Sequence, residues 1–178
     1  RTLRDHPAWS GLASPATRPA SCQALKQAAR ELPLSDEQAA VLGVGAGLWA
    51  VRSSSPEEDL EGSSFAGGYH TELGATEATM ADAVRACFAS ALDIRVLTYK
   101  EQHGFDPLDP RIAVVVQRQI DAEVAGVAFS VNPATNDYDE CAIDAAPGLG
   151  ESVVAGAVTP DHAVVDKHAA QLVRFVDG

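Results

Sequence analysis

The amino-acid sequence predicts an α+β fold, with a mixed and mostly antiparallel sheet flanked by helices. Apolar residues recur at helical spacing in Cys22–Leu32 and again in Thr79–Leu92, which predicts two amphipathic helices. Two β-branched runs, Arg111–Ile120 and Glu123–Pro133, are separated only by Asp-Ala and are typical of a tight hairpin. Helices and paired strands thus follow one another in mixed order, which favours an α+β sheet over regular βαβ alternation.

The first quarter of the chain carries few strand signals. Residues 1–45 are expected to form an irregular lead-in and short helices, and residues 46–178 to form the main domain. Ser35–Gln38 has the residues of a capping box and predicts a short helix that ends at Gly43. The glycines of Gly43–Trp49 lie between a helix and a strand, the reverse of the order in a dinucleotide-binding fingerprint, and therefore indicate a turn.

The later elements are read in the same way. Thr79–Asp82 is a second candidate capping box, and the helix behind it is expected to break near Asp93. Glu140–Glu151 begins as a strand and ends in a glycine-rich turn. Two short strands, His162–Lys167 and Gln171–Val176, are expected to follow it.

The composition narrows the function classes. Lys and Arg total 13 against 25 Asp and Glu, so the net charge is -12. This charge argues against binding to nucleic acid or to anionic membranes, both of which require cationic surface. No apolar run approaches the length of a membrane span. Cys22, Cys87 and Cys141 are far apart and lack metal-ligand spacing, so we expect reduced thiols and a cytoplasmic location.

One stretch has the residues of a phosphate site. Arg52 follows a short apolar run, where its planar fork of donors can leave the core and meet phosphate oxygens. Ser63–Gly68 is a turn of small residues whose backbone N–H groups can approach an anion closely, and Thr71 adds a hydroxyl. The alternative is a surface ion pair between Arg52 and Glu57, Glu58 or Asp59.

Four stretches make the sequence recognisable: AVRSSSPEEDLEGSSFAGGYHTELGA, ACFASALDIRVLTYKEQHG, AVVVQRQIDAEVAGVAFSVNPAT and AAPGLGESVVAGAVTPDHAVVDK, in this order. Together they resemble the nucleotide-binding domain of the phosphoenolpyruvate synthase, pyruvate phosphate dikinase and rifampicin phosphotransferase family, across Trp49–Lys167. The resemblance implies an ATP-grasp-like fold, in which two α+β subdomains clamp ATP. We expect this chain to hold only part of that domain.

The resemblance also implies nucleotide-binding positions. Arg52 matches an arginine that contacts the ATP phosphates, and Thr71 matches the threonine that closes the glycine loop over them. Gln117 matches a glutamine at the nucleotide hinge, and Gln119 would offer its backbone to the adenine edge. Glu151 lies beside the nucleotide cleft according to the resemblance. The alternative is that this glutamate only stabilises the N-terminus of a helix. The expected ATP-binding residues are Arg52, Gly67, Gly68, Thr71, Gln117, Gln119 and Glu151.

By the same resemblance, the parent protein moves the β-phosphoryl group of ATP to a histidine on a swivelling domain. The phosphohistidine then phosphorylates an acceptor, which is pyruvate or a small-molecule hydroxyl. ATP and Mg²⁺ are the expected cofactors, and the swivelling and acceptor-binding domains are the expected partners. The family's metal ligands belong to a later segment, so no catalytic residue or metal ligand is expected in this chain. We expect the isolated chain to be inactive.

Two other interpretations stay open. The family's early ATP-contacting lysine has no counterpart in Arg1–Ser21, and His70 stands where the family's loop carries an acid. These departures favour a non-catalytic module that binds a nucleotide or a partner; the third possibility is a structural fragment that binds no nucleotide. His162 and His168 lack the glycines and serine that precede the family's phosphohistidine, so neither is expected to carry phosphate.

Overall fold

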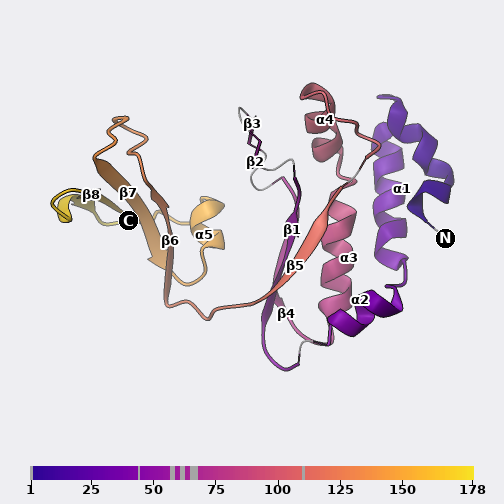
Figure 1. Cartoon of the computed structure of the whole chain (residues 1–178), viewed down its shortest axis with the longest axis horizontal. Coiled ribbons are helices and arrows are strands. Elements are labelled where there is room, and N and C mark those ends of the chain that lie inside the picture. The colour runs from indigo at the N-terminus through magenta and orange to yellow at the C-terminus, as the bar shows by residue number, and fades with distance from the viewer. Residues whose placement is uncertain (1, 44, 57–58, 61–62, 65–67, 110) are drawn as a thin grey trace. The chain divides into compact units, whose positions relative to one another are not determined.

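The chain folds into two compact units, Arg1–Gln119 and Ile120–Gly178 (Figure 1). The structure is a computed structural model that describes residues 2–178 except 44, 57–58, 61–62, 65–67 and 110. Both units contain an antiparallel sheet, and the larger helices belong to the first unit. The α+β fold class predicted from the sequence is confirmed.

Unit 1 combines a helical layer with a small sheet. Its elements are the 3-10 helices η1 (Leu3–Asp5) and η2 (Pro7–Ala13), the helices α1 (Arg18–Glu31), α2 (Asp36–Val41), α3 (Met80–Ser90) and α4 (Ile94–Gln102), and the strands β1 (Trp49–Ser54), β2 (Asp59–Leu60), β3 (Ser63–Ser64), β4 (Thr71–Ala75) and β5 (Ala113–Arg118). The irregular lead-in expected before Cys22 is largely 3-10 helix, and α1 begins at Arg18.

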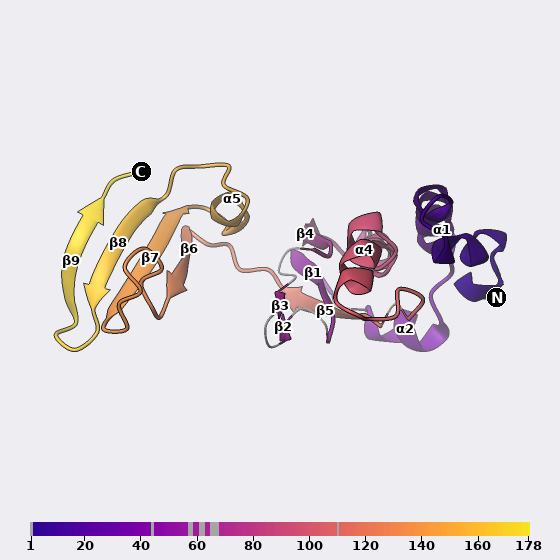
Figure 2. The ribbon, with the colours of Figure 1, turned by 90° about the horizontal axis from the view of Figure 1, so that it is seen from above.

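The sheet of unit 1 has helices on one side. β1 is its central strand, in the antiparallel order β4-β1-β5. α3 contacts all three strands, and α1 packs on α3. Both ribbon views show α1 and α4 on the same side of this sheet, and Figure 1 shows α3 there as well (Figure 2). The opposite face is therefore the one at which strand side chains can meet a ligand.

Two apolar clusters join these layers. The cluster between sheet and helix contains Val51, Ala75, Met80, Ala83, Val84 and Cys87. The cluster among α1, α3 and α4 contains Leu12, Cys22, Leu25, Ala29, Ala89, Leu92 and Leu97. The helical spacing of Cys22, Leu25 and Ala29 in the sequence thus corresponds to the buried stripe of α1. Burial also raises the pKa of the Cys87 thiol to about 11.

The helix ends follow the sequence signals in part. Ser35 accepts a hydrogen bond from the N–H of Gln38 at 3.2 Å and completes the predicted capping box of α2. The capping box predicted at Thr79 is wrong, because Thr79 itself has helical backbone angles and its hydroxyl accepts the N–H of Thr76 at 2.9 Å. The predicted break is confirmed: Asp93 lies between α3 and α4 and caps α4.

The hairpin expected between Arg111–Ile120 and Glu123–Pro133 is wrong. β5 pairs with β1 in unit 1, whereas β6 (Val124–Phe129) pairs with β7 (Glu140–Pro147) in unit 2. The Asp-Ala dipeptide lies in the connection between the units rather than in a tight turn. Each strand found a partner elsewhere in the chain, which a local turn signal cannot reveal.

Unit 2 is a four-stranded antiparallel meander. Its sheet has the order β6-β7-β8-β9, with β8 at Asp161–Asp166, β9 at Gln171–Val176 and the short helix α5 at Glu151–Val154. The strand and glycine turn predicted for Glu140–Glu151 and the two strands predicted after it are confirmed. In the described part of the chain, no helix has both the length and the apolar character needed to cross a bilayer.

The same substitution should lower the free energy of unfolding more on the buried face of the β4-β1-β5 sheet than on its open face. Val51→Ala removes two methyl groups from a fully buried site and should lower the free energy of unfolding by about 2 kcal/mol. Val115→Ala makes the same change where the side chain is 41% exposed, and should cost less than about 1 kcal/mol. Urea unfolding followed by the fluorescence of Trp9 and Trp49, both in unit 1, measures the two values. Equal losses would contradict this assignment of faces.

Candidate functional site

The candidate site is the sheet face of unit 1 opposite the helices. Along β1, Val51 and Ser53 are buried toward α3, and Arg52 and Ser54 between and after them are exposed. Successive side chains of a strand point to opposite faces, so burying Val51 places Arg52 on the open face. The physical cause of this Arg52 position is therefore the hydrophobic contact of its neighbour with α3.

The strand register aligns further side chains with Arg52. Its Cα partners are Thr71 on β4 and Val115 on β5, so these three residues form one row across the sheet. Gln117 lies two residues beyond Val115 and is paired with Ala50 in the next row of the same face. A cation, a hydroxyl, an apolar side chain and an amide thus share one surface, as a site for a polar ligand with an aromatic part requires.

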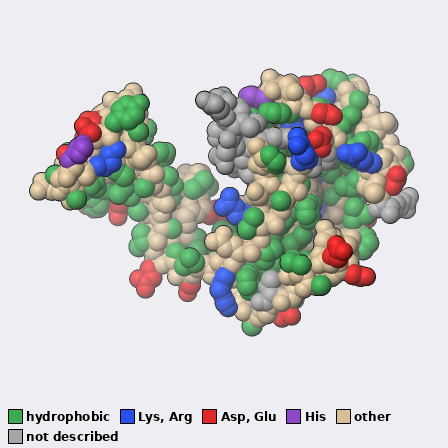
Figure 3. Space-filling view, viewed as in Figure 1, with side chains coloured by type: hydrophobic (Ala, Val, Ile, Leu, Met, Phe, Trp, Pro, Cys, Tyr) green, Lys and Arg blue, Asp and Glu red, His purple; other side chains and the backbone are tan. Residues whose placement is uncertain are grey.

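Arg52 is available for an anion within the described part of the chain. No hydrogen bond or ion pair to its side chain is found there, and the residue is exposed. The alternative partners Glu57 and Glu58 lie outside the described residues, as does the side chain of Asp59. Other basic side chains on the face of unit 1 seen in Figure 3 stand apart from one another instead of forming a broad patch.

The ends of the glycine loop are held next to β1. Gly67 lies outside the described residues, and Gly68 is half-buried at the C-terminal end of the loop. Tyr69 is 9% exposed, packs with Ala91 and Val96, and donates from its hydroxyl to the Ser55 hydroxyl at 3.2 Å. Because Ser55 directly follows β1 and Tyr69 precedes β4, this buried contact on the helix side ties the start of the connection between the two strands to its end.

Gln119 has a role that the sequence did not indicate. Its side-chain oxygen accepts the N–H of Gly74 at 2.6 Å, and its own N–H donates to the Leu48 carbonyl at 2.9 Å. The residue therefore closes the end of the sheet, where Gly74 takes a positive φ of 72° at the end of β4. Its backbone N–H is engaged in the fold, so any adenine contact would have to use another Gln119 group.

Glu151 belongs to unit 2 and stands apart from this group in the chain. It is exposed, begins α5 and follows a glycine turn in which Gly148 has a φ of 86°. An acidic side chain in the first turn complements the partial positive charge of a helix N-terminus. The local geometry thus matches the simpler of the two interpretations of Glu151 and leaves its carboxylate accessible to solvent.

The described histidines near carboxylates are hydrogen-bonded to them. His70 lies 2.9 Å from Glu72, His162 lies 2.7 Å from Asp144, and His168 lies 2.9 Å from Asp139. Among the residues that the structure describes, no group of three His, Cys, Asp or Glu side chains is arranged to hold a metal ion. The described residues therefore do not fit the Mg²⁺ implied by the resemblance.

The sequence analysis did not identify Val115, nor the cations Lys26, Arg30 and Arg95, as candidate site residues. Val115 supplies apolar surface beside Arg52, and its alternation with Gln117 could have shown that both share one face. Lys26, Arg30 and Arg95 line a pocket beside Gly68–His70, but the first two come from α1 and the third from α4, so no sequence signal joins all three.

Comparison with known proteins defines the family. The sequence matches the family described as pyruvate phosphate dikinase, AMP/ATP-binding domain, over residues 23–176. It is 46% identical over 125 residues to a probable phosphoenolpyruvate synthase of Methanocaldococcus jannaschii, which covers 70% of this chain and 10% of that protein. It is 48% identical over 128 residues to the uncharacterized phosphotransferase YvkC of Bacillus subtilis, covering 71% of this chain and 15% of that one.

A third relative is the phosphoenolpyruvate synthase of Pyrococcus furiosus, 44% identical over 119 residues, or 66% of this chain and 15% of that protein. The chain therefore belongs to the AMP/ATP-binding domain family of pyruvate phosphate dikinase. Its aligned part spans between 10% and 15% of the length of these three curated relatives. The matched residues include every expected ATP-binding position from Arg52 to Glu151.

The role of Gln119 can be tested by amide exchange. Gln119→Ala removes the acceptor of the Gly74 N–H, and a lost hydrogen bond of about 1 kcal/mol should speed exchange of that amide by roughly fivefold. Hydrogen exchange measured by NMR reports this amide directly. Gln117→Ala is the matched control and should leave the Gly74 rate unchanged, since Gln117 lies on the open face. The same acceleration in both variants would show that Gln119 has no special contact.

Proposed function

We propose that the open face of the β4-β1-β5 sheet binds the phosphates of ATP. The observation that carries the proposal is the row formed by Thr71, Arg52 and Val115 in strand register. A guanidinium fork suits phosphate oxygens, a hydroxyl can donate to them, and an aliphatic side chain can lie against a base or ribose. Membership of a family described as AMP/ATP-binding supports the same nucleotide.

Each expected residue has a proposed part. Arg52 pairs with phosphate oxygens, and the backbone N–H groups of Gly67 and Gly68 cover them from the loop. Thr71 donates its hydroxyl from the strand that follows the loop. Gln117 and Gln119 flank the adenine at the end of β5, and Glu151 is proposed from the resemblance as a further ATP-binding residue.

The proposed reaction of the whole protein is that of a phosphoenolpyruvate-synthase-like phosphotransferase. The β-phosphoryl group of ATP passes to a histidine on another domain and AMP leaves, water takes the γ-phosphoryl group as phosphate, and an acceptor such as pyruvate or a small-molecule hydroxyl then takes the phosphoryl group from the histidine. The relatives named as phosphoenolpyruvate synthases and as a phosphotransferase support this class. Residues of this chain bind and orient ATP, which is a large part of catalysis in phosphoryl transfer.

We place the protein in the cytoplasm, since its three cysteines are free thiols.

A second candidate is a non-catalytic module that binds nucleotide without transferring phosphate. The observation in its favour is His70, which stands in place of the family's acid and is hydrogen-bonded to Glu72 at 2.9 Å. If the chain is such a module, the open face binds ATP, but neither the isolated chain nor the intact protein transfers a phosphoryl group. Detection of phosphohistidine in the intact protein after addition of ATP would exclude it.

The contribution of Arg52 is measurable in the chain itself. Arg52→Ala should weaken ATP binding by about 1.5–3 kcal/mol, a rise in Kd of more than tenfold, because it removes hydrogen bonds to a charged group. NMR titration detects weak binding through the amides of Thr71, Val115 and Gln117. Arg4→Ala removes the same charge from the 3-10 helix η1 and should leave the Kd within twofold. An unchanged Kd for the Arg52 variant would remove this residue from the site.

The chain alone should not transfer phosphate. Its net charge of -12 repels a triphosphate, and no described cluster is suited to the metal ion that would screen the phosphates. Incubation with ATP labelled at the β and γ positions and Mg²⁺ should therefore leave the protein unlabelled and release no AMP at a catalytic rate. Stoichiometric label on His70, His162 or His168 would overturn both this expectation and the assignment of the phosphohistidine to another domain.

A further inference from the structure

A second polar pocket lies on the helix side of unit 1, away from the Arg52 face. It has a volume of about 260 Å³, and three of its lining side chains, Lys26, Arg30 and Arg95, are cations. Lys26 and Arg30 come from α1, one helical turn apart, and Arg95 comes from the first turn of α4. We call this the α1–α4 pocket.

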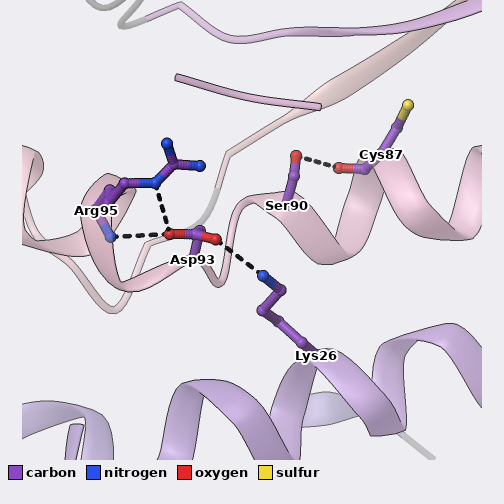
Figure 4. Close-up of polar contacts among 5 residues, drawn as sticks. All are labelled: Lys26, Cys87, Ser90, Asp93 and Arg95. Carbon is purple, nitrogen blue, oxygen red and sulfur yellow. Dashed lines mark hydrogen bonds and ion pairs between the residues drawn. The ribbon is translucent and has the colours of Figure 1, made fainter. Parts of the chain in front are cut away.

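Asp93 positions two of the three cations. Its carboxylate accepts Lys26 Nζ at 2.8 Å, and its other oxygen accepts the N–H of Arg95 at 3.0 Å and Arg95 Nε at 3.3 Å (Figure 4). Burial alone would raise the Asp93 pKa, but the hydrogen bonds from Lys26 and Arg95 outweigh it and lower that pKa. Asp93 therefore remains an anion that holds the two cationic side chains on either side of it.

The charges in the α1–α4 pocket do not cancel. Among the side chains that line the pocket, three cations face one carboxylate, which leaves two positive charges; Glu72, hydrogen-bonded to His70, lies next to the lining but is not part of it. Arg30 is exposed and has no hydrogen bond or ion pair among the described residues, and Arg95 bonds Asp93 through Nε, so its two Nη groups point elsewhere. In a chain of net charge -12, such a local excess is unusual and favours an anion of two negative charges.

The rest of the lining limits the kind of anion. Gly68, Tyr69 and His70 bring the backbone that leaves the glycine loop, and Ser90 brings a hydroxyl. That hydroxyl already donates to the Cys87 carbonyl at 2.6 Å, so it can only accept from a ligand (Figure 4). The free donors are therefore the guanidinium groups of Arg30 and Arg95 and the remaining N–H groups of Lys26, and guanidinium groups match tetrahedral oxyanions better than they match a single-point acceptor.

We propose that the α1–α4 pocket is a second anion site, which binds a phosphate group between Arg30 and Arg95 beside Gly68. The ligand is inorganic phosphate or the phosphate of a small monoester, since both present the same dianionic group. The pocket lies on the α3 side of the sheet, whereas the ATP phosphates are proposed on the open face, so the two sites use different side chains and share only the backbone of Gly68. A bound phosphate would contact the segment Gly68–His70 that leads into β4.

NMR titration of the 178-residue chain with sodium phosphate at constant ionic strength tests the site. The amides of Gly68, His70, Ser90 and Arg95 should shift together and saturate with a Kd in the millimolar range, as a few exposed charge-assisted hydrogen bonds allow. Arg30→Gln alone should raise the Kd at least threefold, and Arg30→Gln with Arg95→Gln at least tenfold. Arg111→Gln is the matched control, an exposed arginine paired with Asp109, and should leave the Kd within twofold.

Arg30→Gln is the safer variant, since the described structure gives this side chain no partner to lose. Absence of saturable shifts up to 50 mM phosphate, or equal weakening by Arg111→Gln, would overturn the proposal. Methyl phosphate separates the two sources: tighter binding than inorganic phosphate indicates a monoester, and the reverse indicates the free ion. Phosphate binding retained in Arg52→Ala, with ATP binding retained in Arg30→Gln, separates this site from the proposed function. Loss of both affinities in both variants would show that there is one site and overturn the inference.

Discussion

The alternation of side chains along β1 is the constraint on which unit 1 depends. Val51 is fully buried against Met80, Ala83 and Cys87 of α3, and this contact decides which way every other side chain of the strand points. A shift of one residue in the register would bury the Arg52 guanidinium beneath α3 and expose Val51, at the cost of an unpaired buried charge and a lost core contact. Packing on one face of the sheet therefore places the phosphate-binding chemistry proposed for the other face.

Local structure was more predictable than strand pairing. The apolar stripe of α1, the capping box of α2 and the break at Asp93 each depend on residues a few positions apart, so the sequence contains the whole signal. The hairpin prediction failed because β5 and β6 are adjacent in sequence but pair with β1 and β7, and β-branched composition does not specify a partner. The capping box predicted at Thr79 failed for a more local reason, because the Thr79 hydroxyl accepts the N–H of Thr76 in the preceding turn.

For the candidate site too, the sequence predicted individual residues better than it predicted which residues lie together. Arg52, Thr71 and Gln117 were predicted through the resemblance, but the strand register was needed to place them on one face with Val115. Gln119 was expected to serve a ligand through its backbone, and the structure gives its N–H and its side chain to the sheet. The cations of the α1–α4 pocket had no sequence signal at all, because Lys26 and Asp93 are 67 residues apart and meet only when α1 packs near α4.

The short segment Gly68–Thr71 links the two anion sites that we propose. Thr71 stands in the row of Arg52 on the open face, while Gly68 and His70 line the α1–α4 pocket. Between them, Tyr69 is buried among Ala91 and Val96 and is hydrogen-bonded to Ser55, so the middle of the segment is fixed to the core. A displacement of Gly68 by a ligand in the pocket would have to move Tyr69 before it reached Thr71. The packing therefore separates Thr71 from the pocket, and Gly68, which is proposed for both sites, is the residue through which the two sites would be coupled.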